Sequence, residues 1–133
     1  MNSDGIQSLR QALAAFAAER DWDQFHSPKN LSMALIAEVA ELVEHFQWLT
    51  DAESRALPPS SHEAVRLELA DVFIYLIRLA DKLDIDLLVA ARDKMALNEL
   101  RYPAQWARGS ARRAAAYELG EPLVQNNQKN VGD

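Results

Sequence analysis

Apolar residues recur along much of this chain at the spacing of an α-helix, about 3.6 residues per turn. In the first such stretch Ile6, Leu9, Leu13 and Phe16 share one stripe, which predicts a helix over about residues 6–20. No segment shows a convincing alternation of apolar and polar residues, the pattern of a half-buried β-strand. The chain is therefore predicted to be all-α.

A second helix is predicted from a start signal that follows a polar connector. Ser27 is typical of an N-cap residue, and Pro28 is typical of the first helical position. We expect this helix to continue to about Leu49.

A third helix is predicted after the break at residues 57–60, Leu-Pro-Pro-Ser. Ser60 with Glu63 three residues later has the form of a capping box. We therefore expect the helix to open at Ser60 and to run to about Leu83.

The fourth predicted helix begins near Asp84 or Asp86 and ends at Tyr102, because the residue before a proline is pushed out of the helical region. The chain has 133 residues, so the four helices fit one domain, which we place at residues 1–115. Residues 116–133 end in a polar run without periodicity and are expected to form a flexible tail.

Composition and charge narrow the class of protein. Hydrophobic residues make up 49% of the chain and charged residues 26%, as in ordinary globular proteins. Without cysteine, a leader segment or an apolar run of about 18 residues, the chain is expected to be cytoplasmic and to have no membrane partner. The net charge of −6 disfavours nonspecific nucleic-acid binding, so no nucleic-acid partner is expected. The last third nevertheless holds a group of basic residues that can face phosphates or balance the acidic helices, namely Arg92, Lys94, Arg101, Arg108, Arg112 and Arg113.

Two acidic pairs lie inside apolar helical segments. Glu38 and Glu41 belong to the run MALIAEVAELVEHF, and Glu68 and Asp71 belong to VRLELADVFIYLI. Residues three apart share one helix face, so each helix offers half of a site. If the two helices pack antiparallel, at about 8–10 Å between axes, the four side chains can converge. Buried carboxylates need partners, and a divalent cation is the simplest.

The choice of metal follows from the ligand atoms. Oxygen ligands without cysteine or paired histidine suit Mg²⁺, with Mn²⁺ as the alternative, better than zinc. Mg²⁺ often takes its remaining ligands from substrate phosphates, so a phosphate-bearing substrate is implied. A single pair of acids three apart is usually a solvated helix face, but here apolar residues surround both pairs.

Aromatic residues near the acids are candidates for binding a base. Trp48 follows Glu38 by ten residues on the acid side of the second predicted helix, and Tyr75 follows Asp71 by one turn, so both are expected to line one cavity. Trp22 lies in the connector before that helix, although a tryptophan is more often a core residue than a ligand contact.

Polar candidates for ligand binding lie in the connector and on the fourth helix. His26 and Lys29 stand where a loop can close over a ligand, and His26 can equally cap or pack. Lys94, Asn98 and Arg101 share one face of the fourth helix, which can alternatively be a solvated face. The two remaining histidines, His45 and His62, are expected at the surface.

Four runs of the sequence, taken together and in order, resemble one known family. ERDWDQFHSPKNL, EVAELVEHFQW, ELADVFIYL and KMALNELRYP are similar to the MazG-like nucleoside triphosphate pyrophosphohydrolases, and within them to the dCTP pyrophosphatase branch, over about residues 9–103. The resemblance implies a four-helix MazG-like bundle that forms a dimer or a dimer of dimers, a homotetramer. It also implies an Mg²⁺-dependent enzyme that cleaves a nucleoside triphosphate between the α and β phosphorus atoms, releasing the monophosphate and pyrophosphate.

The resemblance also suggests roles for individual residues. It implies that Glu38, Glu41, Glu68 and Asp71 are the catalytic and metal-binding acids, and which glutamate orients the water stays open. It implies phosphate or sugar contacts for Lys94 and Asn98, with Arg101 and Tyr102 as weaker candidates. Base or sugar contacts are implied for Trp22, Trp48 and Tyr75.

Three functions compete at this point. The first is a pyrophosphohydrolase that removes dCTP or a modified dCTP from the nucleotide pool. The second is the related phosphoribosyl-ATP pyrophosphohydrolase, which shares the acids but accounts less well for the aromatic residues. The third is a nonenzymatic helical oligomer whose acids are a solvated face or a structural site that binds a cation. Because apolar residues surround most of the second and third helices, self-association is expected in every case.

Overall fold

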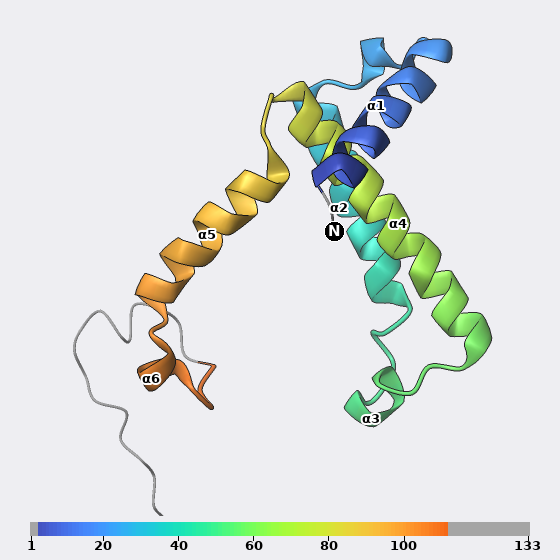
Figure 1. The fold of residues 1–133 in the computed structure, drawn as a ribbon. Helices are drawn as coiled ribbons and strands as arrows, with labels where there is room; N and C mark the ends of the chain where they lie inside the picture. Colours follow the sequence, from blue (N-terminus) through green and yellow to red (C-terminus); the bar gives the residue numbers. More distant parts are fainter. Residues whose placement is uncertain (1–2, 112–133) are drawn as a thin grey trace, which may run out of the picture. The chain divides into compact units, whose positions relative to one another are not determined.

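A computed structural model describes residues 3–111, which contain helices and connecting turns and no strand. In order they are α1 (Ser3–Glu19), the 3₁₀ helix η1 (Asp23–Phe25), α2 (Pro28–Glu44), α3 (Asp51–Ser54), α4 (Pro59–Lys82), α5 (Leu87–Arg101) and α6 (Ala104–Ala107) (Figure 1). The all-α prediction is confirmed for this part of the chain. The predicted tail, residues 116–133, lies outside the described residues, as do Arg112 and Arg113.

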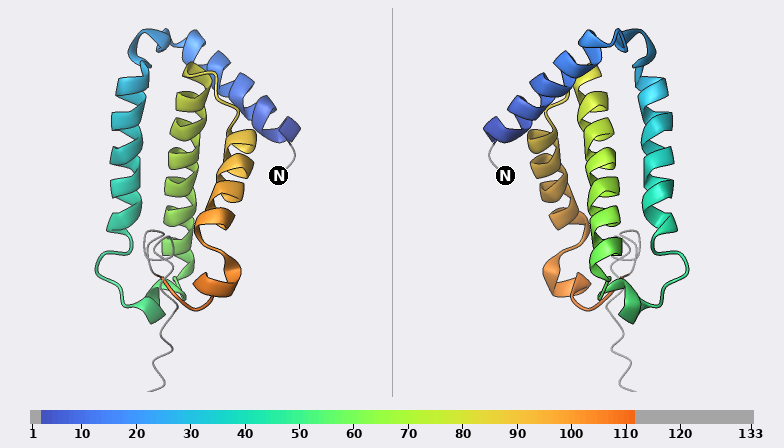
Figure 2. Two further views of the ribbon diagram at one scale, coloured as in Figure 1. Left: turned by 90° about the vertical axis from the view of Figure 1, so that its left-hand side faces the viewer. Right: turned by 90° about the vertical axis from the view of Figure 1, so that its right-hand side faces the viewer.

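The chain divides into two compact units, Met1–Leu88 and Val89–Asp133. In the first unit α2 packs antiparallel along α4, which is the arrangement that convergence of the acids requires, and α1 packs against α4 (Figure 2). The apolar side chains buried in this unit come from all three helices: Ala17, Leu31, Val65, Ile77 and Ala80. The second unit contains most of α5, and α6 begins directly after Pro103. Whether residues 1–115 form one domain stays a prediction.

The predicted start of α2 is confirmed, whereas that of α4 is wrong. The Ser27 hydroxyl accepts a hydrogen bond from the backbone N–H of Asn30 at 3.1 Å, with Pro28 in the first turn. Helix α4 begins at Pro59, one residue before Ser60, and no side chain caps it. The fixed φ of proline suits the first helical position, so the helix starts there. Glu63 instead accepts hydrogen bonds from Arg66.

The predicted end of the second helix is also wrong, because α2 stops at Glu44. A turn follows, and Thr50 then caps α3: its hydroxyl accepts from the Glu53 N–H at 3.2 Å, and the Glu53 carboxylate accepts from the Thr50 N–H at 3.0 Å. The α-helical pattern has already ended before this capping box: the N–H of Phe46 donates to Val43 O and that of Leu49 to Phe46 O, both at 2.9 Å, which are the three-residue bonds of tight turns. The sequence Thr-Asp-Ala-Glu carried the signal of the capping box. Trp48 consequently lies outside any helix and is 87% exposed.

Large apolar side chains are exposed on both long helices of the first unit. The side chains that are more than half exposed include Met33, Ile36 and Val43 on α2, and Leu67 and Leu69 on α4. Exposed apolar side chains of this kind agree with the expected self-association, which stays a prediction. Among the described residues, no helix combines the length and apolar character that crossing a membrane requires.

Candidate metal and nucleotide site

Three of the four predicted acids meet between α2 and α4. One carboxylate oxygen from each of Glu38, Glu41 and Glu68 lies within 4.8 Å of the others. Glu38 and Glu68 are half-buried and Glu41 is exposed. The antiparallel contact of the two helices brings these groups together although they lie about thirty residues apart in sequence. Clustered acids are common on protein surfaces, so the surroundings decide what the cluster can do.

Two oxygens of this cluster are buried without compensation. Glu38 Oε2 and Glu68 Oε2 have no hydrogen-bond partner among the described residues. Burial raises the pKa of Glu38, and a hydrogen bond shared with Glu41 and repulsion from Glu41, Asp71 and Glu68 raise it further. Unpaired, buried and mutually repelling carboxylate oxygens fit the ligand set of a hard divalent cation such as Mg²⁺.

Asp71 lies at the edge of the cluster, outside the group of three. Its charge reaches Glu38, where it contributes to the raised pKa, and its own side chain is exposed. Asp71 also lines the neighbouring pocket, so it belongs to the surroundings of both features.

His45 corrects one prediction made from the sequence. It is half-buried rather than a surface residue, and its Nε2 lies 3.7 Å from Glu68 Oε1. His45 is the C-cap of α2 and keeps helical backbone angles, so it lies at the end of α2 beside Glu68 of α4. His62 is exposed, as predicted.

A pocket of about 300 Å³ lies beside Asp71. Three of the predicted nucleotide contacts, Trp22, His26 and Tyr75, line it. The Trp22 ring packs edge-on against Phe16, with the ring centroids 5.8 Å apart, and its centroid lies 6.3 Å from that of His26. The remaining walls come from α1 and α4: Leu13, Phe16, Ala17, Ile74 and Arg78. The pocket is apolar and aromatic with a few polar groups, which is the usual make-up of a small-molecule site.

Trp48 and Lys29 do not line this pocket. The cavity predicted for Trp48 and Tyr75 is therefore not this pocket, which Tyr75 lines together with Trp22. Lys29 is exposed in the first turn of α2. The binding roles of both residues stay predictions.

The predicted phosphate contacts lie in the second unit. Asn98 and Tyr102 line an open hollow of about 640 Å³ together with Arg92, Met95, Ala96 and Glu99. Lys94 and Arg101, on the same helix, are exposed and do not line it. A meeting of these residues with the acids stays a prediction, because α5 from Val89 onward belongs to the second unit.

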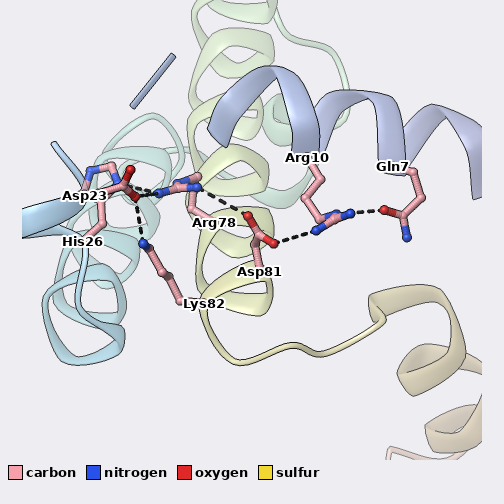
Figure 3. Close-up of polar contacts among 7 residues, drawn as sticks. All are labelled: Gln7, Arg10, Asp23, His26, Arg78, Asp81 and Lys82. Atoms are coloured by element: carbon pink, nitrogen blue, oxygen red, sulfur yellow. Dashed lines mark hydrogen bonds and ion pairs between the residues drawn. The ribbon is translucent and has the colours of Figure 1, made fainter. Parts of the chain in front are cut away.

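Sequence reasoning missed a polar network around Arg78 on α4 (Figure 3). Arg78 is only 4% exposed and bonds to Asp23 and His26 in the connector after α1. Lys82 also donates to Asp23 at 2.7 Å, and Asp81 links Arg78 to Arg10 of α1. An arginine inside the apolar run VFIYLIRLA was the available signal.

The chain matches the model of the MazG-like family over residues 34–114. The chain belongs to the MazG-like family. It is 44% identical over 130 residues to dCTP pyrophosphatase 1 of Mus musculus, covering 96% of this chain and 76% of that protein. It is 48% identical over 110 residues to dCTP pyrophosphatase 1 of Homo sapiens, covering 81% and 65% respectively.

A solved structure shares the MazG-like chain's fold. It is the crystal structure of a pyrophosphatase from Archaeoglobus fulgidus, 38% identical, with a TM-score of 0.71, covering 74% of this chain and 93% of that one. The MazG-like match itself contains all four acids, the whole of α4 and the part of α2 that carries Glu38 and Glu41. The connector with Trp22 and His26 precedes that match, but the alignment with the mouse protein extends over nearly the whole chain.

Proposed function

We propose that this MazG-like protein hydrolyses dCTP, or a dCTP modified on the base, to the monophosphate and pyrophosphate. The observation that carries the proposal is the adjacency of two features through Asp71: a cluster of carboxylates with uncompensated oxygens, and an aromatic pocket large enough to hold a base. The sequence identity of 44% and 48% to two dCTP pyrophosphatases supports the choice of substrate. Cleansing of the cytoplasmic nucleotide pool is the role that this activity would serve.

The acids Glu38, Glu41, Glu68 and Asp71 are proposed to hold Mg²⁺, with Mn²⁺ as the alternative metal. When bound, the cation neutralises triphosphate charge that would otherwise repel an attacking water. Glu38 and Glu68 present the buried oxygens for this purpose, and the more exposed Glu41 and Asp71 can reach the substrate side of the site. One of the three glutamates is proposed to orient or deprotonate the water.

The base is proposed to enter the pocket between Trp22 and Tyr75. Stacking on an aromatic ring contributes about 1–3 kcal/mol per base to binding, so its loss should raise KM measurably. Trp48 and Lys29 are proposed as further contacts with the nucleotide. Lys94 and Asn98 are proposed to contact phosphate or sugar, and Arg101 and Tyr102 are weaker candidates for the same role.

Self-association belongs to the same proposal. Exposed apolar residues on α2 and α4 give each protomer a surface suited to a second copy. We therefore propose a dimer or a dimer of dimers as the working form. Four helices, α1, α2, α4 and α5, would make up the bundle of each protomer.

A substrate panel tests the function. The protein is incubated with Mg²⁺ and dCTP, 5-methyl-dCTP, CTP, dTTP, dATP or phosphoribosyl-ATP, and released pyrophosphate is measured. We expect dCTP and its 5-methyl form to react fastest and to yield monophosphate. A Glu68→Gln variant purified in parallel controls for contaminating phosphatases. Fastest turnover of phosphoribosyl-ATP would favour the phosphoribosyl-ATP pyrophosphohydrolase instead, and release of pyrophosphate from no compound would refute the proposal.

A further inference from the structure

Arg78 stands out because it is a charged side chain buried beside the aromatic pocket. It follows Tyr75 by three residues on α4, on the same side of the helix, and lines the same pocket. Its Nη2 donates to Asp23 Oδ1 at 3.0 Å, and its Nη1 lies 3.5 Å from Asp81 Oδ2 (Figure 3). A buried guanidinium needs such partners, so the ion pairs explain its charge. They do not explain its third contact, with His26.

The contact with His26 determines where the imidazole carries its proton. Arg78 Nη2 lies 3.2 Å from His26 Nδ1. A guanidinium nitrogen can only donate a hydrogen bond, so Nδ1 must be the acceptor. The neutral ring then has its proton on Nε2. Nε2–H is therefore the only N–H that His26 can offer to a ligand.

The surroundings of His26 keep the ring neutral. Burial lowers its pKa, the charges of Arg78 and Lys82 lower it further, and only Asp23 acts in the opposite direction. At neutral pH the imidazole is therefore uncharged and has one donor and one acceptor. The acceptor, Nδ1, is already bonded to Arg78.

We propose that Arg78 is a positioning residue that holds His26 as an Nε2–H donor in the aromatic pocket, so that the pocket selects a base with a hydrogen-bond acceptor. The inference rests on the proposed function, because it assigns the pocket to a nucleotide base. Arg78 also lines the pocket, and its Nε is buried without a hydrogen-bond partner among the described residues, so we include it in the proposal as a second donor. Cytosine suits two donors, since its O2 and N3 both accept, whereas thymine and uracil present an N3–H donor beside O2.

Two substitutions of His26 separate donation to substrate from attachment to Arg78. In His26→Gln the amide nitrogen can take the place of Nε2 and donate into the pocket. In His26→Asn the amide oxygen can take the place of Nδ1 and accept from Arg78, but the donor into the pocket is lost. We expect His26→Asn to raise KM for dCTP about tenfold, with kcat within about threefold of wild type, and His26→Gln to stay within about threefold in both. The reverse order would overturn the proposal, since it would show that His26 only anchors the connector.

The tautomer itself can be observed without any assay of activity. Long-range ¹H–¹⁵N spectra of the protein labelled in its 3 histidines report which ring nitrogen is protonated, and His26→Gln identifies the His26 signals. We expect a single Nε2–H tautomer between pH 7 and pH 8. An Nδ1–H tautomer or a charged ring at pH 7 would overturn the proposal.

Arg78→Met, with Arg10→Met as the matched control, tests the cause. Each variant removes one arginine bonded to Asp81, but only Arg78 contacts His26. Without Arg78, the charged groups around His26 are Asp23, Lys82 and, across the pocket, Asp71. Removal of Arg78 takes away one of the charges that lower the pKa of His26, while burial and Lys82 still lower it and Asp23 still raises it, so we expect the pH dependence of KM for dCTP to shift to higher pH in Arg78→Met and not in Arg10→Met. Equal pH profiles in the two variants would overturn the role of Arg78.

The outcomes keep this inference apart from the proposed function. If no triphosphate is hydrolysed, the proposed function fails, whereas the spectra of the wild-type protein still decide the tautomer. If dCTP is hydrolysed and His26 is found as the Nδ1–H tautomer, only the inference fails. If Arg78→Met does not fold, the inference is tested by the spectra of the wild-type protein and by the comparison of His26→Gln with His26→Asn.

Discussion

Glu38→Gln should make the metal-free protein more stable and at the same time inactive. The substitution keeps the shape of the side chain and removes one of the clustered charges. Glu38 is half-buried on α2, and its carboxylate faces those of Glu41 and Glu68. The native structure accepts this repulsion, which we attribute to the need for a metal site.

The size of the effect follows from the distances. At the 4.8 Å limit that bounds the three oxygens, two full charges repel by about 0.9 kcal/mol in a medium as polar as water, and by about 3.5 kcal/mol at an effective dielectric constant of about 20. Glu38→Gln removes two of the three pairs. Solvent around Glu41 and the raised pKa of Glu38 both reduce the repulsion that is felt in the native state. We therefore expect a net gain of about 1–2 kcal/mol, which is a rise in Tm of roughly 3–8 °C.

Thermal unfolding in EDTA and in Mg²⁺ measures both sides of this prediction. In EDTA the variant should melt above the wild type. At Mg²⁺ about 100-fold above its Kd the wild type should gain about 2.7 kcal/mol and the variant much less, so their order should reverse. Release of pyrophosphate should fall at least about 100-fold in Glu38→Gln, and likewise in Glu41→Gln, Glu68→Gln and Asp71→Asn.

Glu63→Gln is the matched control for Glu38→Gln. Glu63 lies on α4 and pairs with Arg66 at the surface. Its loss should leave the response to Mg²⁺ and the turnover unchanged. If Glu38→Gln instead lowers Tm in EDTA while responding fully to Mg²⁺, the carboxylate cluster is not a metal site and the reasoning is refuted.

Trp48→Ala should raise KM for dCTP and flatten the ranking among bases without lowering Tm, because a ring that is 87% exposed has little packing to lose; an unchanged KM removes Trp48 from the site. Below about pH 4 the protein should lose stability through Asp23. A hydrogen bond from Lys82 and a weaker one from Arg78 lower the pKa of Asp23 in the folded protein. The stability that this ionised carboxylate contributes is therefore present above its unfolded pKa and is lost as the pH falls through its folded pKa. Lys82→Met should make the fall of Tm at low pH less steep, and an unchanged fall would contradict the role given to Lys82. Light scattering at micromolar concentration should report a dimer or a dimer of dimers, and a monomer would rule out the assembly proposed here.

The sequence alone was sufficient for the features that depend on local spacing. The helical periodicity identified α1, α2, α4 and α5 to within a few residues, apart from the end of α2. The N-cap at Ser27 was predictable because capping involves only the next three residues. The two acidic pairs were predictable for the same reason, since each lies within a single helical turn.

Helix ends that depend on competing signals were harder to predict. The sequence around Ser60 has the form of a capping box, but the helix starts one residue earlier, at Pro59. After Glu44 the chain forms tight turns instead of continuing α2, although the residues up to Leu49 are largely apolar, and a capping box at Thr50 then starts α3. In both places two local patterns were compatible with the sequence.

Only the tertiary structure decided which distant residues meet. Arg78 bonds to Asp23 across 55 residues of chain, and Arg10 bonds to Asp81 across 71. Such pairs depend on how α1 and the connector pack on α4, which no periodicity reveals. The same packing brings Trp22 into one pocket with Tyr75. Hydrophobic patterning tells which face of a helix is buried, but the burial is non-directional, so the partner of a buried polar group is known only when the helices are in place.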